Sequence, residues 1–252
     1  MRIFGLLFLM MSFDIFADEI QSVSQHISIR KQNETGRQQD LLAKITIDRK
    51  FDLGLQGTYL ERFDLYEKRA GAFLVYRPQE RWNLEFRYLQ GIGSEILPER
   101  QSILSAYYAW APGLTPFVFY RDTRYSSTHL HTVSLGLEIE KIPHLIFIPT
   151  TMLGKATFNT ISETEDVHSF GLKIIYYSEQ KFSFSIFGYK GQEASQGVVG
   201  RSSEMIDTLS GGITASVFLA SNLKSEIILD HTDYDQLNNQ FQTTTLNLTW
   251  ML

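Results

Sequence analysis

The stretch WNLEFRYL, residues 82–89, decides the fold. Its apolar and polar residues take opposite parities, with Trp82, Leu84, Phe86 and Tyr88 on one and Asn83, Glu85 and Arg87 on the other. A side-chain period of two is typical of a β-strand, because successive side chains point to opposite faces of the sheet. The segment therefore predicts a strand with an apolar medium on one side and a polar medium on the other.

The same alternation returns along the rest of the chain. The clearest repeats are AKITIDRK (43–50), FDLGLQGTY (51–59), VSLGLEIEK (133–141), SFGLKIIY (169–176), KFSFSIFG (181–188) and NLKSEIILDH (222–231). We count about fourteen such segments of roughly 8–12 residues, which is the length that a tilted, membrane-spanning β-strand requires.

The connections between these segments alternate in length. Short links such as RPQER (77–81), EKIPH (140–144) and LASN (219–222) fall between longer polar loops such as GIGSEILPER (91–100). Short turns at one end and long loops at the other are typical of outer-membrane barrels, whereas a soluble β-sandwich has no reason to sort its connections. We therefore predict the all-β class, as a transmembrane antiparallel up-and-down β-barrel in the bacterial outer membrane.

The strand count has two alternatives. Fourteen strands are predicted, but Pro149 interrupts LIFIPTTML (145–153), and the first segment, SVSQHISIRK (22–31), is only partly patterned, so twelve strands remain open. The last segment, TTTLNLTWML (243–252), alternates clearly. Because lipid cannot satisfy an open sheet edge, we expect this last strand to pair with the first.

Composition excludes several other classes. The chain has 252 residues, 13% aromatics, a net charge of −5 and no cysteine. After the first residues no segment approaches the roughly 20 apolar residues of a membrane helix. The negative charge argues against a nucleic-acid partner. The lack of cysteine excludes disulfides and a cysteine-anchored lipoprotein, and we expect no cofactor.

The N-terminus, MRIFGLLFLMMSFDIFADEI, reads as a secretory signal. Arg2 precedes an apolar core, residues 3–13, and the small residue Ala17 follows at a suitable cleavage position. We assign residues 1–17 to a signal peptide and residues 18–252 to the barrel. The expected partners are outer-membrane lipid including lipopolysaccharide, the barrel-assembly machinery and an envelope polysaccharide.

Two groups of side chains are assigned to the two faces of the wall. The charged candidates for the lumen or a constriction are Arg62, Arg69, Arg77, Glu85, Arg87, Glu138, Glu140, Lys173, Glu226 and Asp230. The candidates for interfacial girdles, where a ring with a polar edge is favoured, are Trp82, Tyr88, Tyr108, Trp110, Tyr176 and Trp250. The opposed charges either define a selective constriction or pair with inward Tyr and Phe side chains to plug the lumen.

The middle of the chain resembles the YaiO-type outer-membrane β-barrel family. The resemblance covers roughly residues 75–252 and is carried by Leu97, Pro98 and Arg100, then Tyr108, Leu114, Pro116, Tyr120, Arg121 and Tyr125, and by FGYKGQEA (187–194). It implies an outer-membrane location and a barrel fold. It implies no catalytic residues.

Two histidine-containing segments are candidates for chemistry. LDHTDYD (229–235) suggests an acid–base cluster or a cation site, but Asp230 and His231 are adjacent and point to opposite faces of a regular strand. THLHT (128–132) holds His129 and His131, a metal pair with no third ligand beside it in the sequence. We therefore predict no catalytic and no metal residues.

The function predicted from these patterns is a narrow pore or structural barrel for small hydrophilic or saccharide-related solutes. The alternatives are a non-conducting barrel that binds a partner through loops such as residues 191–204, and a barrel hydrolase that acts at the loop mouth.

Overall fold

The computed structural model describes residues 18–29, 34–62, 65–92, 97–158, 163–178, 182–194, 205–234 and 239–251. The segment assigned to the signal peptide, residues 1–17, lies outside the described residues. The strands are β1 (Glu19–Ile29), β2 (Glu34–Asp48), β3 (Phe51–Arg62), β4 (Leu65–Tyr76), β5 (Trp82–Ile92), β6 (Arg100–Tyr108), β7 (Leu114–Arg124), β8 (Thr128–Ile142), β9 (Leu145–Phe158), β10 (Glu163–Tyr177), β11 (Phe182–Ala194), β12 (Met205–Ala220), β13 (Leu223–Tyr234) and β14 (Asn239–Met251).

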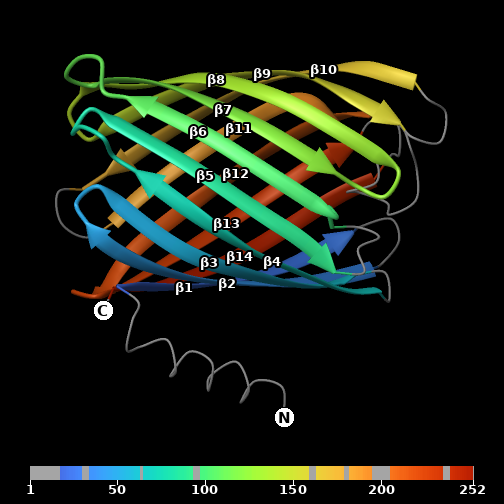
Figure 1. Cartoon of the computed structure of the whole chain (residues 1–252), viewed down its shortest axis with the longest axis horizontal. Coiled ribbons are helices and arrows are strands. Elements are labelled where there is room, and N and C mark those ends of the chain that lie inside the picture. The colour runs from blue at the N-terminus through green and yellow to red at the C-terminus, as the bar shows by residue number, and fades with distance from the viewer. Residues whose placement is uncertain are drawn as a thin grey trace, which may run out of the picture.

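These strands form one closed antiparallel barrel in which each strand pairs with its neighbours in sequence (Figure 1). The barrel closes where β1 pairs with β14, for example at Ile20 with Trp250 and at Ser24 with Leu246. The predicted fold class is confirmed, with fourteen strands rather than twelve. Closure hydrogen-bonds the backbones of the first and last strands, β1 and β14, so that this sheet edge does not face lipid unpaired.

Pro149 does not break β9, because pairing continues on both sides of it. The β8–β9 ladder keeps one register from Gly136–Thr150 to Ile139–Phe147 and shifts only further on, between Ile139 and Ile142. On the other side, Pro149 stays opposite Leu172 of β10. Proline cannot donate a backbone hydrogen bond, so it weakens one ladder locally without ending the strand. Pro149 is therefore not a sign of fewer strands.

The short connections gather at one end of the barrel. Residues 49–50, 143–144 and 221–222 form two-residue links, and they lie with the C-terminus at the left of Figure 1. We call this the turn end, and the opposite end the loop end. Most loop-end connections lie outside the described residues.

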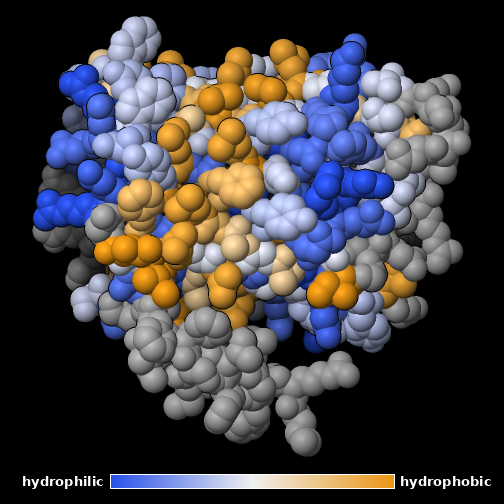
Figure 2. Space-filling model, in the orientation of Figure 1, coloured by the Kyte–Doolittle hydropathy of each residue, from blue (hydrophilic) through white to orange (hydrophobic). Residues whose placement is uncertain are grey.

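The outer surface carries an apolar belt. Large hydrophobic side chains are widely exposed on alternate strand positions, among them Leu135 at 51%, Leu246 at 41% and Leu248 at 38%. On the face shown in Figure 2, a hydrophobic band lies between more hydrophilic ends. A water-soluble monomer rarely exposes so large an apolar surface, and in a sandwich these leucines would be buried. The sandwich alternative is therefore wrong. No helix among the described residues is long and apolar enough to cross a membrane.

The residues predicted for aromatic girdles lie mostly near the turn end. The Trp82 and Tyr108 rings are tilted against each other with centroids 4.6 Å apart, and the Tyr176 ring centroid lies 5.9 Å from that of Phe182. Trp110 and Trp250 are 68% and 51% exposed. Tyr88 lies further toward the loop end, where its hydroxyl donates to Gln90. Their role at a membrane interface stays a prediction.

Inside the barrel, three phenylalanines lie against glycines of the neighbouring strand. Phe73, Phe117 and Phe187 pair in register with Gly54, Gly136 and Gly212. A Cβ on Gly54 or Gly136 would come within 2.1 Å of the facing ring, and one on Gly212 within 2.5 Å of Phe187. Each ring therefore spreads along the wall over a position without a side chain.

Candidate functional site: the barrel lumen

The charged residues predicted for the lumen alternate with the exposed apolar residues, and their side chains therefore point inward. On β5, Glu85 and Arg87 alternate with Phe86, which is 48% exposed. On β13, Glu226 and Asp230 alternate with Ile227 and Leu229. The same parity holds for Arg62 on β3, Arg69 on β4, Glu138 and Glu140 on β8 and Lys173 on β10. Arg77 lies in the turn that follows β4.

Ion pairs fix two of the predicted arginines. The Arg77 guanidinium donates to the buried Asp52 carboxylate at 2.6 Å, and this hydrogen bond raises the pKa of Arg77. Arg87 pairs with Glu85 at 2.7 Å and also donates to Gln56 at 3.2 Å. Both arginines are held against the wall.

An arginine-rich side of the lumen runs over β3, β4, β5 and β7. The Arg62 guanidinium carbon lies 4.9 Å from the Phe241 ring centroid, and that of Arg87 lies 5.4 Å from the Phe73 ring centroid. Arg69 donates to Gln101 at 3.4 Å. It is also within electrostatic range of Arg87 and Arg121. Several positive charges thus face one region of the lumen.

Arg121 was missed as a lumen residue because β7 is apolar on both faces. Phe117 and Phe119 face inward with it, while Val118 and Tyr120 face outward and are 37% and 41% exposed. Because both faces of β7 carry large apolar residues, the alternation of polar and apolar residues does not show which face borders the lumen.

The wall formed by β11 to β14 is lined with hydroxyl groups. Ser183 and Ser216 share a hydrogen bond of 2.7 Å, and Ser210 and Thr232 share one of 2.8 Å. Thr214 and Thr245 are also buried on this wall, and Glu226 and Asp230 add negative charge. This side therefore differs chemically from the arginine-rich side.

A short segment of the β5–β6 connection folds into the mouth of the barrel at the loop end. The backbone N–H of Leu97 donates to the carboxylate of Glu67 at 2.5 Å, and Leu97 packs on Leu60. Glu67 is only 2% exposed. Sequence reasoning missed Glu67, because its partner is 30 positions away and in a loop.

We expect Glu67→Ala to release this segment. A hydrogen bond to a charged acceptor contributes about 1.5–3 kcal/mol, so amide hydrogen exchange at Leu97 should rise roughly ten- to a hundredfold. Glu67→Gln is the matched control, because its amide oxygen can still accept the hydrogen bond, and we expect a smaller rise. Equal exchange in Glu67→Ala and the unmodified protein would show that the carboxylate does not hold the segment.

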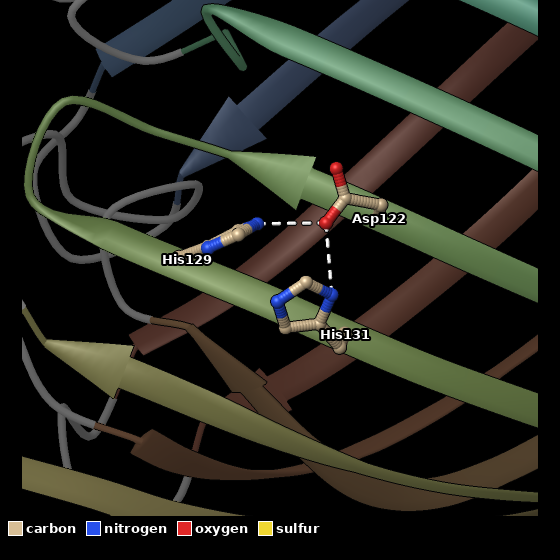
Figure 3. Close-up of side chains that lie close together, drawn as sticks. All are labelled: Asp122, His129 and His131. Atoms are coloured by element: carbon tan, nitrogen blue, oxygen red, sulfur yellow. Dashed lines mark hydrogen bonds and ion pairs between the residues drawn. The ribbon is translucent and has the colours of Figure 1, made fainter.

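The two histidine-containing segments have different outcomes. In LDHTDYD, Asp230 faces the lumen, whereas His231 and Asp233 face outward and pair at 3.3 Å, so the residues do not converge on one site. In THLHT, the structure does bring a third group to His129 and His131: Asp122 on the neighbouring strand β7 (Figure 3). The sequence offers no third ligand beside this pair, because the partner comes from strand pairing.

Comparison with solved structures finds outer-membrane barrels. The chain is similar to the CymD monoaromatic hydrocarbon channel, with a TM-score of 0.62 and 11% identity over 94% of this chain and 89% of that one. It is also similar to a bacterial polysaccharide outer membrane secretin, with a TM-score of 0.56 and 12% identity over 93% and 98%. An anion-selective porin from Comamonas acidovorans follows with a TM-score of 0.52 and 7% identity over 92% and 98%.

No protein-family model matches the chain, and no curated protein matches it either. The YaiO-type resemblance is therefore not confirmed. The closed barrel, its apolar belt and its charged interior nevertheless define a class. The protein is a porin-like β-barrel of the bacterial outer membrane, and the predicted fold and location are both confirmed.

Proposed function

We propose that the protein is a narrow, water-filled pore for small hydrophilic solutes. The observation that carries this proposal is the accessibility of inward-facing charges. Side chains of Lys44, Glu85, Arg87 and Glu226 retain 26%, 27%, 29% and 24% of their surface exposed although they point into a closed barrel. Water can therefore reach charged groups along the lumen wall, which favours an open path over a packed plug.

The inward aromatic side chains support the same proposal. Phe73 and Phe117 lie over glycines of the adjacent strand, so their rings take little space near the barrel axis. Tyr107, Phe117 and Phe119 form a cluster with centroids 5.3 to 5.5 Å apart. The rings cover the wall rather than cross the lumen.

Saccharide-related solutes fit the lining best within the hydrophilic class. The hydroxyl-rich wall of β11 to β14 offers neutral donors and acceptors, while the aromatic cluster of β6 and β7 offers apolar faces like those on which sugar rings stack. The YaiO-type resemblance is part of this proposal, as are export through residues 1–17 and contacts with lipopolysaccharide and the assembly machinery.

Conductance of the folded protein in a planar bilayer tests the pore. A heat-dependent shift in gel migration first establishes that the barrel is folded. We expect ohmic single-channel steps, and uptake of small sugars by protein-containing liposomes that falls off for larger oligosaccharides. A folded barrel that neither conducts nor admits sugars would overturn the pore and favour the surface-binding alternative.

One observation favours that alternative. Leu97 and Pro98 are buried at the loop end, and a separate cluster of Ala156, Phe158 and Val167 is buried on β9 and β10. If these side chains close the mouth of the barrel and do not merely narrow it, the lumen conducts no ions.

A further inference from the structure

A cluster outside the lumen carries a separate inference. Asp122 on β7 pairs in register with His131 on β8, and His129 lies two residues further along the same face. These residues share the parity of exposed apolar side chains: Asp122 lies two positions from Tyr120, and His131 two positions from Val133, and both of those neighbours are 41% exposed. The cluster therefore lies on the outer surface of the barrel, at the loop end and directly beyond the apolar belt.

Three ligand atoms converge there. The Asp122 Oδ1 atom lies 2.7 Å from His129 Nε2 and 2.8 Å from His131 Nδ1, as the dashed lines in Figure 3 show. All three atoms lie within 4.8 Å of one another. A tetrahedral ion with bonds of about 2.0–2.1 Å needs ligand atoms roughly 3.3 Å apart. A small rotation of the carboxylate would supply that spacing.

The neighbours of the cluster orient its ligands. The Arg100 guanidinium lies 3.8 Å from Asp122 Oδ2, so the opposite oxygen, Oδ1, is the one turned to the histidines. Arg100 thus holds the carboxylate from the side away from the ion, as outer partners of metal ligands do. The Tyr120 hydroxyl lies 3.3 Å from His131 Nδ1, the nitrogen offered to the ion, so this contact is given up when the ion binds. The positive charges of Arg100 and of Lys155, which pairs in register with His131, will weaken but not prevent binding of a cation.

We propose that Asp122, His129 and His131 bind one divalent transition-metal ion, of the class of Zn²⁺, Ni²⁺ or Cu²⁺. Imidazole nitrogen is the ligand that these ions take readily, whereas Ca²⁺ and Mg²⁺ prefer sites made of oxygen. The side chains of His129 and His131 are 30% and 44% exposed. Ions can therefore enter from outside, and the remaining coordination positions are open to water.

Calorimetric titration of Zn²⁺ into the folded barrel tests this site, with protein that carries no polyhistidine tag. We expect one ion per chain. His129→Ala, His131→Ala and Asp122→Asn should each weaken binding by at least tenfold. His168→Ala is the matched control, since His168 is exposed on the outer face of β10 and is not part of the cluster, and it should bind Zn²⁺ as before.

A second measurement separates binding from folding. Zn²⁺ should raise the unfolding temperature of the unmodified barrel and of His168→Ala, but not of His131→Ala, with each variant first shown to fold by gel migration. The absence of saturable binding would overturn the proposal. Equal affinity in His131→Ala, or equal competition by Mg²⁺, would do the same.

Discussion

The double variant Arg69→Glu, Arg121→Glu is expected to shift the pore toward cations by on the order of tenfold in the permeability ratio. At about 8 Å in water, one unit charge acts on an ion with roughly 0.5 kcal/mol. The two reversals change the wall by four charge units, and screening at moderate salt reduces their effect by about half. The change lowers the energy of a cation in the pore and raises that of an anion by the same amount, so the effect on the cation-to-anion permeability ratio is doubled.

The reversal potential across a bilayer in a salt gradient measures this shift. The matched control is Arg37→Glu, Arg124→Glu, which makes the same charge change at exposed positions whose parity places them on the outer face of β2 and β7. We expect the control to leave selectivity nearly unchanged. If both double variants shift the reversal potential equally, the ions do not pass along the arginine-rich side. The shift should also shrink as salt concentration rises.

The sequence was sufficient for the fold because the deciding pattern is local. The alternation within each strand shows which of its side chains face lipid and which face the lumen, as with Phe86 between Glu85 and Arg87. Closure of the barrel follows because every backbone group at a sheet edge must be hydrogen-bonded in lipid. β1 is the informative exception: its outer positions Ser24 and His26 are polar and exposed. That strand is defined by pairing with β2 and β14 on both sides rather than by its pattern.

The parts that sequence reasoning missed depend on contacts between strands. Asp122 meets His131 only because β7 and β8 pair in one particular register. Glu67 meets Leu97 only because a loop folds inward. The odd or even position of a residue in a strand places its side chain inside or outside the barrel. It does not show which residues of neighbouring strands lie opposite each other. Register is needed for that, and it is set by the turns and by packing.

The variant Gly136→Ala is expected to destabilise the barrel by about 1–3 kcal/mol, the usual cost of overpacking. The three atoms nearest to the added Cβ all belong to the Phe117 ring, at 2.1, 2.5 and 2.8 Å. That ring is itself held by Tyr107 and Phe119, with centroids 5.4 and 5.3 Å away. It cannot move aside without disturbing both neighbours. The free energy of unfolding, from denaturant titration in lipid vesicles, measures the loss.

Two further variants separate a steric cause from a general effect of alanine. Gly57→Ala places a Cβ with nothing within 4 Å, so it should be neutral or stabilise the barrel, because alanine restricts the unfolded chain. In the double variant Gly136→Ala, Phe117→Leu, the smaller side chain leaves room for the Cβ. The two changes should therefore couple favourably by about 0.5–3 kcal/mol. If the two free-energy changes simply add, the Phe117 ring and the added Cβ do not clash, and the ring does not lie over Gly136.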